Sequence, residues 1–392
     1  MLQRFKRIDG ITVIVLLMLM GISILSIYSV THGGDDKGMH IQMLQYYGAG
    51  FVVFFGLSLF DYRLLVKYAL YIYILGIIIL VLVSLFGTVK FGARAWLQVG
   101  SFSFQPAELF KLILILALSS LLVRLGRSQL RFWRDVAPLS LVALLPFGIV
   151  ILQNDMGNAL SFVVILVGLL WIGRIKVSHA LIGLLIAGGA FGAFVYSYIN
   201  YHEKTTDFLS VAIGREHFVK RFDPWLVPER ASSDDSYQTR NARIAIGSGG
   251  LSGEGYLKGS SVQSGKIPVL YSDAIFAQIA EEFGFIGAAV LLLLFFVLIH
   301  RMILFALECK DKAGPFLIIG IIAMLLYQIL ENIGAYIGLM PLTGITLPFI
   351  SFGGTSILIN MASMGIAMSV HLYGQDVEED LPAPANVFLS SR

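Results

Sequence analysis

Long apolar runs are the feature that most constrains what this chain can fold into. A helix needs about 20 consecutive apolar residues to cross a lipid bilayer, and runs of this kind recur along almost the whole sequence. They lie near residues 11–31, 46–61, 67–87, 107–124, 137–152, 157–173, 179–200, 274–300, 314–340 and 350–373. Only 14% of the residues are charged, compared with about 25% in soluble domains. The sequence therefore predicts an all-α, polytopic transmembrane helical bundle of about ten spans.

Lys and Arg are distributed unevenly between the two sets of short connections, and this predicts the orientation of the chain. The side that holds both termini carries Arg4, Lys6, Arg7, Arg63, Lys67, Arg124, Arg127, Arg131, Arg134, Arg174, Lys176, Arg301, Lys310 and Lys312. The opposite short connections carry Lys37, Lys90 and Arg94. Because positively charged short loops stay in the cytoplasm, we expect both termini to be cytoplasmic.

One connection is much longer than the others and predicts an outer, extracellular segment. It runs over residues 201–272, between the seventh and eighth spans, and carries Trp225, many glycines and scattered arginines. Loops of this length are functional or disordered, and we expect this one to contain short helices at the membrane surface. We therefore expect one membrane domain over residues 1–374 and a disordered cytoplasmic tail over residues 375–392, which is rich in acids and proline.

Several classes of site are disfavoured by the residue inventory. The single cysteine, Cys309, excludes a disulfide within the chain and a multi-cysteine metal site. The seven histidines are dispersed, so a preformed zinc site is not expected. The net charge of +3 gives no indication of nucleic-acid binding, and we expect none.

Ionisable groups near membrane spans are costly and are therefore candidates for function. Glu108 and Lys111 follow Pro106, are three residues apart and share a helix face, so they can pair. They are either part of a site or a structural ion pair between helices. Arg94 and Trp96, just before them, are either a site or an anchor at the membrane interface.

The long connection holds the second group of candidates. Arg221, Arg240 and Arg243 give it a positive surface, and the guanidinium group suits phosphate oxygens. The glycines at 247, 249, 250, 253 and 255 could let backbone N–H groups approach a phosphate. The alternative is a solvated, flexible loop.

Two further clusters flank the last three spans. Asp273 lies where the long connection enters the eighth span, and Glu281 lies two helical turns further on nearly the same face. These carboxylates could act as a base or hold a metal, although Asp273 could also only cap the helix. In the ninth span Gln328, Glu331 and Asn332 must face a protein interior or a wet cavity. The Pro- and Gly-rich stretch 341–356 cannot be a regular lipid-exposed helix, so it forms either a groove floor or a structural re-entrant turn.

Four stretches together resemble the SEDS family of bacterial cell-shape, division and sporulation proteins. They are GARAWLQVGSFSFQPAELFKL, RIAIGSGGLSGEGYLKGS, YSDAIFAQIAEEFGFIG and NIGAYIGLMPLTGITLPFISFGGTS, and they occur in the family's order. The short cytoplasmic tails favour the RodA subgroup, which serves cell elongation.

The resemblance implies a function and a set of site residues. It implies a peptidoglycan glycosyltransferase of the bacterial plasma membrane that polymerises lipid II and releases undecaprenyl pyrophosphate. It also implies a class B penicillin-binding protein as partner. The family's essential acid falls on Asp273, its helix-four pair on Glu108 and Lys111, its outer-loop Trp on Trp96, and its Pro-Phe-x-Ser segment on Pro348 to Ser351. The family's usual Gln-Pro-Asp-x-Gly-Thr reads Gln-Asn-Asp-Met-Gly-Asn at residues 153–158, and its usual Gln-Ser reads Asn-Ala at 241–242.

A mechanism follows as a hypothesis. Asp273 would take the proton from the 4-hydroxyl of the acceptor sugar. Arg94, Arg221, Arg240 or Arg243, or a divalent cation such as Mg²⁺ or Mn²⁺, would neutralise the departing pyrophosphate. The alternatives are a lipid II flippase and a non-catalytic scaffold for cell-wall synthases.

Overall fold

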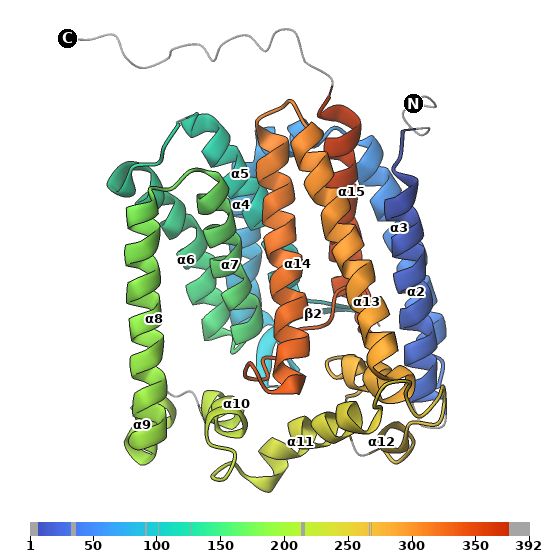
Figure 1. The fold of residues 1–392 in the computed structure, drawn as a ribbon. Helices are drawn as coiled ribbons and strands as arrows, with labels where there is room; N and C mark the ends of the chain where they lie inside the picture. Colours follow the sequence, from blue (N-terminus) through green and yellow to red (C-terminus); the bar gives the residue numbers. More distant parts are fainter. Residues whose placement is uncertain are drawn as a thin grey trace, which may run out of the picture.

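A computed structural model describes residues 7–32, 37–90, 92–100, 102–126, 128–212, 216–265, 267 and 269–375. Long helices stand side by side, and the long connection packs across one end of them (Figure 1). The bundle consists of α2 (Gly10–Thr31), α3 (Met39–Leu59), α4 (Tyr62–Phe86), α5 (Pro106–Leu125), α6 (Ala137–Leu152), α7 (Met156–Ile172), α8 (Val177–Asn200), α13 (Ile275–Glu308), α14 (Ala313–Ile337) and α15 (Gly354–Tyr373). The tail expected from residue 375 onward lies almost wholly outside the described residues.

The predicted all-α membrane architecture is confirmed. Among the described residues, eight helices are long and apolar enough to cross a membrane, and α7 is a shorter apolar helix. The remaining predicted run corresponds to α3, which begins earlier than expected, at Met39, and has polar residues in its first turns. The last helix begins at Gly354 rather than near 350, because the preceding residues belong to an irregular segment. Helix α2 begins and α15 ends at the same end of the bundle (Figure 1).

A small antiparallel sheet was not predicted. Strands β1 (Thr88–Lys90), β2 (Ala93–Val99) and β3 (Phe102–Phe104) pair in the order β1-β2-β3 between α4 and α5. Gly92 and Gly100, with φ of 79° and 60°, lie at the two turns, where a positive φ favours glycine. The N–H of Arg94 joins the sheet to the bundle by donating to the carbonyl of Gln153 at 3.2 Å, and the hydroxyl of Thr355 in α15 donates to the carbonyl of Ser103 in β3 at 3.0 Å.

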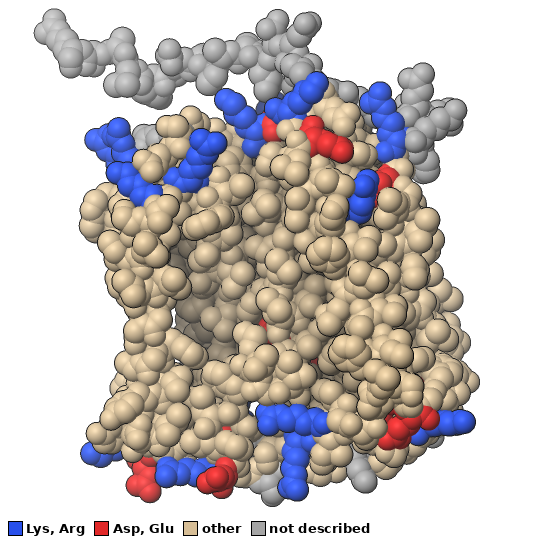
Figure 2. Space-filling model, viewed as in Figure 1, with Lys and Arg blue, Asp and Glu red and all other residues tan. Residues whose placement is uncertain are grey.

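The core of the bundle is formed by α5, α14 and α15. In the most apolar 18-residue stretch of each helix, 83%, 67% and 89% of the residues are buried, respectively. Helix α8 is the opposite extreme. No residue of its most apolar 18-residue stretch is buried, and its one buried residue is Tyr198, near its end. The space-filling view shows a recess between α8 and the rest of the bundle (Figure 2). The bundle therefore has a packed half and a half that is open to lipid.

The long connection contains the short helices expected of it. They are α9 (His202–Asp207), the π-helical turn η2 (Phe208–Ala212), α10 (Glu216–Leu226), α11 (Ser233–Ser248) and α12 (Ser260–Gln263). Helix α10 is amphipathic, with Phe218, Phe222 and Trp225 spaced along one face. Together these helices cover the end of the bundle at which α13 begins and α14 ends (Figure 1).

Helix α13 is broken at Gly284, and the glycine-rich turn after α11 repairs the break. Gly284 has a φ of 65° and a ψ of −162°, so helical hydrogen bonds on both sides of it are lost. The N–H groups of residues 254 and 255 donate to the carbonyls of Glu281 and Glu282, at 2.9 and 3.0 Å. The N–H groups of residues 285 and 286 donate to the carbonyls of Gly250 and Leu251, at 2.9 and 3.1 Å.

This contact requires glycine because two backbones meet without side chains between them. A Cβ on Gly249 would lie 1.9 Å from the carbonyl oxygen of Ala280, and one on Gly253 would lie 2.2 Å from that of Glu282. The N–H groups of Gly249, Gly253 and Gly255 all donate to carbonyls of the protein. The interpretation of these three glycines as a phosphate cradle is therefore wrong.

We expect Gly249→Ala to destabilise the protein strongly. Because the added methyl group collides with backbone rather than with a flexible side chain, the cost should reach or exceed the 1–3 kcal/mol typical of about one methylene of overpacking. The apparent Tm of the purified protein in detergent measures the loss. Gly247→Ala is the matched control, since a Cβ there meets nothing within 4 Å and Ala is a better helix former than Gly. Equal melting temperatures for the two variants would contradict this account of the turn.

Candidate active site

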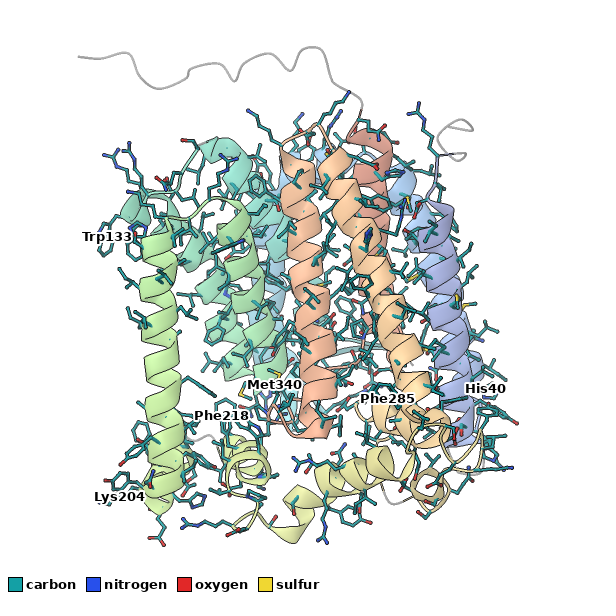
Figure 3. All side chains as sticks on the ribbon, viewed as in Figure 1. His40, Trp133, Lys204, Phe218, Phe285 and Met340 are labelled. Carbon is teal, nitrogen blue, oxygen red and sulfur yellow. The ribbon has the colours of Figure 1, made fainter. Side chains whose placement is uncertain are left out.

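The start of α13, the end of α14 and the irregular segment 341–353 meet at the end of the bundle covered by the long connection. Figure 3 labels Met340, which follows α14, and Phe218 of α10 at this end. Asp273 precedes α13 by two residues, and Arg221 lies in α10. The structure thus brings residues from distant parts of the sequence to one place at the boundary of the apolar bundle.

Segment 341–353 is held by two adjacent side chains of α14. The Nδ2 group of Asn332 donates to the carbonyl of Ile345 at 2.7 Å and to the carbonyl of Asp273 at 2.7 Å. The carboxylate of Glu331 accepts hydrogen bonds from the backbone N–H of Thr343, at 3.1 Å, and from its hydroxyl group. Asn332 therefore fixes the start of α13 and the irregular segment relative to each other.

Hydroxyl groups hold the far side of the same segment. Ser23 of α2 donates to the carbonyl of Ile350 at 2.7 Å, and Tyr47 of α3 donates to the carbonyl of Phe349. The predicted substrate-binding residue Ser351 is buried, and its hydroxyl accepts the N–H of Leu347 at 2.8 Å. Ser351 thus closes a turn within the segment.

Asp273 presents a carboxylate that does not cap α13. The N-cap residue is Ala274, and it makes no side-chain cap hydrogen bond. The half-buried carboxylate of Asp273 accepts the hydroxyl of Ser272 at 2.8 Å and lies over Gly344, where an added Cβ would be 3.5 Å from Oδ2. Burial raises the pKa of Asp273 above its usual value, while Ser272 and the positive charge of Arg221 lower it. A carboxylate in this setting is a stronger base than one in water.

Arg221 lies among three carboxylates. One of its guanidinium nitrogens donates to the carbonyl of Thr343 at 2.5 Å. Burial lowers the pKa of Arg221, and the charges of Asp155, Glu331 and Asp273 act in the opposite direction. Arg221 therefore supplies the positive charge at the centre of the site.

Helix α10 is anchored to α8, and this anchoring positions Arg221. Asp223 accepts a hydrogen bond from the hydroxyl of Tyr198 at 2.6 Å and interacts with Nε2 of His202 at 2.9 Å. The ring of Phe222 packs against Phe194 and Tyr198 of α8, with ring centroids 5.2 and 5.9 Å apart. Arg221 is thus carried by a short helix with its apolar side on α8 and its basic side chain toward α14.

Arg243 joins Arg221 at a small cavity of about 40 Å³. The cavity lies between α10, α11 and the end of α14, and Lys220 and Trp225 also line it. The guanidinium group of Arg243 passes close to Gly338, where a Cβ would lie 2.9 Å from Cζ. Three cationic side chains therefore line one small cavity, and one of them, Arg221, interacts electrostatically with Asp273.

Asp155 connects this site to α5. It caps the N-terminus of α7, accepting the N–H and the side-chain amide of Asn158 at 3.1 and 2.9 Å. It also accepts the side-chain amide of Gln105, directly before α5, at 2.7 Å. Glu108 and Lys111 lie in the first two turns of α5 and form an ion pair of 2.8 Å, with Lys111 fully buried.

The remaining predicted residues occupy less enclosed positions. Arg94 and Trp96 are on β2, where the side chain of Arg94 is exposed and that of Trp96 is half-buried. Arg240 is exposed on α11, one turn before Arg243. Among the described residues, none of these three side chains forms a hydrogen bond or ion pair with Asp273.

Glu281 does not share a site with Asp273, in contrast to the sequence-based expectation. It is fully buried and accepts the backbone N–H groups of Ser261 and Val262 at 2.8 and 3.2 Å. Its carboxylate thus caps the short helix α12 and holds the long connection to α13. In the described part of the chain, no group of three or more His, Cys, Asp or Glu side chains is arranged to hold a metal ion.

Sequence reasoning missed Asp155 and Thr343 as members of this site and left Glu331 unassigned. Asp155 is a residue type favoured at helix N-caps and directly precedes the apolar run that forms α7, so the sequence could have marked it as a helix cap. Its approach to Arg221 depends on the packing of α7 against α14, which no local pattern reveals.

Comparisons with known proteins agree with the fold. A family model described as FtsW/RodA/SpoVE cell cycle protein matches residues 7–376. The chain is 31% identical to stage V sporulation protein E of Bacillus subtilis, covering 94% of this chain and 98% of that one. It is 32% identical to peptidoglycan glycosyltransferase MrdB of Escherichia coli, covering 94% of both chains. A probable peptidoglycan glycosyltransferase FtsW of Bacillus subtilis is 31% identical, covering 95% of this chain and 92% of that one.

Solved structures share the architecture over almost the whole chain. A protein from a peptidoglycan synthase complex that coordinates polymerization and crosslinking is 26% identical, with a TM-score of 0.77 over 95% of this chain and 99% of that one. The rod shape determining protein RodA of Thermus thermophilus is 27% identical, with a TM-score of 0.67 over 94% of this chain and 98% of that one. Sporulation, MrdB and FtsW relatives are similar to almost the same degree, so identity does not separate the subgroups. The chain belongs to the SEDS family, the FtsW/RodA/SpoVE cell cycle proteins.

Proposed function

We propose that this protein is a peptidoglycan glycosyltransferase that polymerises lipid II into glycan strands and releases undecaprenyl pyrophosphate. The observation that carries the proposal is the half-buried carboxylate of Asp273 beside the guanidinium group of Arg221, at the boundary of an apolar bundle. Relatives that carry the name peptidoglycan glycosyltransferase align over more than nine-tenths of the chain, which supports the assignment.

Asp273 acts as the general base. Its carboxylate takes the proton of the acceptor's 4-hydroxyl group as that oxygen attacks the anomeric carbon of the donor sugar. The new carbon–oxygen bond forms while the bond between the anomeric carbon and the pyrophosphate oxygen breaks, with inversion at carbon. Burial raises the pKa of Asp273 and so favours proton uptake, while the positive charge of Arg221 acts in the opposite direction.

Cationic side chains stabilise the departing pyrophosphate. One cavity is lined by Arg221, Arg243 and Lys220. The two guanidinium groups and the ammonium group can donate hydrogen bonds to phosphate oxygens. Arg94, Trp96 and Arg240, which are less enclosed, contact the lipid-linked sugars as they enter. A divalent cation such as Mg²⁺ or Mn²⁺ that would neutralise the leaving group stays a prediction. Asp273 is the carboxylate that would hold it, because Mg²⁺ is often held by one or two carboxylates together with substrate phosphates.

The open side of the bundle suits a polyprenyl carrier. Helix α8 has apolar side chains exposed along its length and stands apart from the packed helices (Figure 2). A polyprenyl chain can lie against such a surface without leaving the hydrocarbon region. We infer that lipid II approaches the site from this side.

The cellular setting is part of the same proposal. The basic connections predict that both termini face the cytoplasm of a bacterial cell, so the site faces outward. A role in cell elongation, as in the RodA subgroup, belongs to the same proposal, and the similarity to the rod shape determining protein RodA of Thermus thermophilus supports it. The similarity to a protein of a peptidoglycan synthase complex supports a class B penicillin-binding protein as the partner.

Removing the base should abolish polymerisation without unfolding the protein. We expect Asp273→Asn to lower the rate of glycan formation from labelled lipid II by at least about 100-fold, the lower end of general-base contributions. Glu229→Gln is the matched control, since Glu229 is an exposed carboxylate of the same connection. The assay runs in detergent, where a flippase has no measurable activity, with and without partner and chelator. Polymer formation at the normal rate by Asp273→Asn would exclude the base, and an inactive wild type in every condition would favour the flippase or scaffold.

Arg221 should set the pH at which the base is lost. The base works only when deprotonated, so activity falls as the pH drops through the raised pKa of Asp273. Because Arg221 lowers that pKa, we expect Arg221→Gln to raise it further and to move the acid limb of kcat/KM to higher pH. Arg221→Lys should keep most of the effect. Arg240→Gln is the control and should change the rate without moving the acid limb of the pH profile. If Arg221→Gln leaves the acid limb unmoved, Arg221 does not set the pKa of Asp273.

The Glu108–Lys111 pair should behave as a unit. Lys111→Met leaves the carboxylate of Glu108 buried without its partner, which we expect to cost about 3–5 kcal/mol, read as a fall in apparent Tm. The double variant Glu108→Gln/Lys111→Met should recover most of the melting temperature. If the double variant also recovers polymerisation, the pair is structural; a stable but inactive double variant assigns it to substrate binding.

A further inference from the structure

A second cavity lies at the opposite end of the bundle from Asp273. It has a volume of about 790 Å³ and opens between α8 and the π-helical turn η1 (Phe132–Val136) that precedes α6. This is the end at which α2 begins and α15 ends (Figure 1). The proposed reaction makes no use of this cavity.

The mouth of the cavity carries three cations. Arg131, Arg134 and Lys176 line it, and all three side chains are exposed. Within the described ranges of the chain, none of them forms an ion pair with a carboxylate. The one acid of η1, Asp135, is buried and accepts the backbone N–H of Arg131 at 2.7 Å. The positive charge at this corner of the molecule is visible in Figure 2, at the upper left.

The cations are held by two chain segments that are joined to each other. Leu130 and Ile175 form a β-bridge, and the N–H of Leu130 donates to the carbonyl of Arg174 at 3.3 Å. This bridge places the segment carrying Arg131 and Arg134 beside the turn carrying Lys176. The positive mouth is therefore a feature of the folded backbone rather than a chance approach of long side chains.

Behind the mouth, the cavity wall changes to apolar groups at membrane depth. Ile182, Ile186 and Ala190 line it from α8, over a length of about 12 Å at 1.5 Å per residue. The ring of His179 stands edge-on to Phe132, 5.5 Å away, between the charged and the apolar parts. Trp133, at the mouth, is 83% exposed, which is typical of an anchor at the headgroup level. Figure 3 labels this residue beside the end of α8.

We propose that this cavity binds an anionic glycerophospholipid of the adjacent leaflet. Its phosphate lies between Arg131, Arg134 and Lys176, and one acyl chain runs along α8. An apolar recess at this depth is filled by lipid chains, and a mouth with three cations that form no ion pair with any described carboxylate selects among headgroups by charge. The lipid would occupy the space between α8 and η1 and so support the position of α8, whose most apolar 18-residue stretch has no buried residue.

Binding can be measured by native mass spectrometry of the full-length protein, titrated with dioleoylphosphatidylglycerol or dioleoylphosphatidylcholine. We expect the phosphatidylglycerol to bind at least about tenfold more tightly, and the triple variant Arg131→Gln/Arg134→Gln/Lys176→Gln to lose this preference. The triple variant Lys67→Gln/Lys310→Gln/Lys312→Gln is the matched control. It removes the same charge from exposed residues on the same side of the bundle, and it should keep the preference.

A second pair of variants tests the apolar part. Gly183 lines the cavity, so a large side chain there would fill the space proposed for the acyl chain. Gly188 of the same helix does not line the cavity. A Cβ at either position meets nothing within 4 Å, so both substitutions are sterically tolerated. Gly183→Trp should weaken phosphatidylglycerol binding, and Gly188→Trp should not. The proposal is overturned if both lipids bind equally, if both triple variants lose the preference equally, or if undecaprenyl pyrophosphate displaces phosphatidylglycerol at equimolar concentration.

Discussion

Backbone groups at membrane depth must find partners inside the protein, and unpaired ones cost several kcal/mol each. Segment 341–353 has no helical ladder to satisfy its N–H and carbonyl groups, so side chains do this instead. Asn332 and Glu331, adjacent in α14, supply the central hydrogen bonds. The same amide of Asn332 also holds the carbonyl of Asp273. The position of the proposed base therefore depends on the interaction that makes an irregular segment tolerable in a membrane protein.

The broken helix α13 follows the same principle with a different solution. There, the missing partners come from the backbone of the glycine-rich turn after α11, and the close approach excludes side chains at Gly249 and Gly253. Glu281 adds a carboxylate cap for α12. The long outer connection is thus fixed to the bundle by obligatory hydrogen bonds, and it can carry Arg221 and Arg243 to a defined place.

Helix α8 differs from the other spans in how it is held. Its contacts with the site run through α10, where Asp223 and Phe222 join the end of α8 to the helix that carries Arg221. Its other end borders the cavity with the cationic mouth. A helix with so little buried surface depends on lipid for its environment, and both the proposed entry of the polyprenyl donor and the proposed phospholipid site lie along it.

The sequence by itself determined the membrane architecture, because each apolar run is long enough to require a helix in lipid regardless of its neighbours. It also marked Asp273, Arg221 and the polar trio in α14, since charged or polar groups near lipid are conspicuous in any window. Only the tertiary structure decided that Asp155, Glu331 and Asp273 surround Arg221, that Glu281 caps α12, and that the glycines serve α13. The sheet formed by β1, β2 and β3 was missed because its strands are only three to seven residues long. These features depend on contacts between segments far apart in the chain, and periodicity and local propensity carry no information about which distant backbone or carboxylate will be the partner.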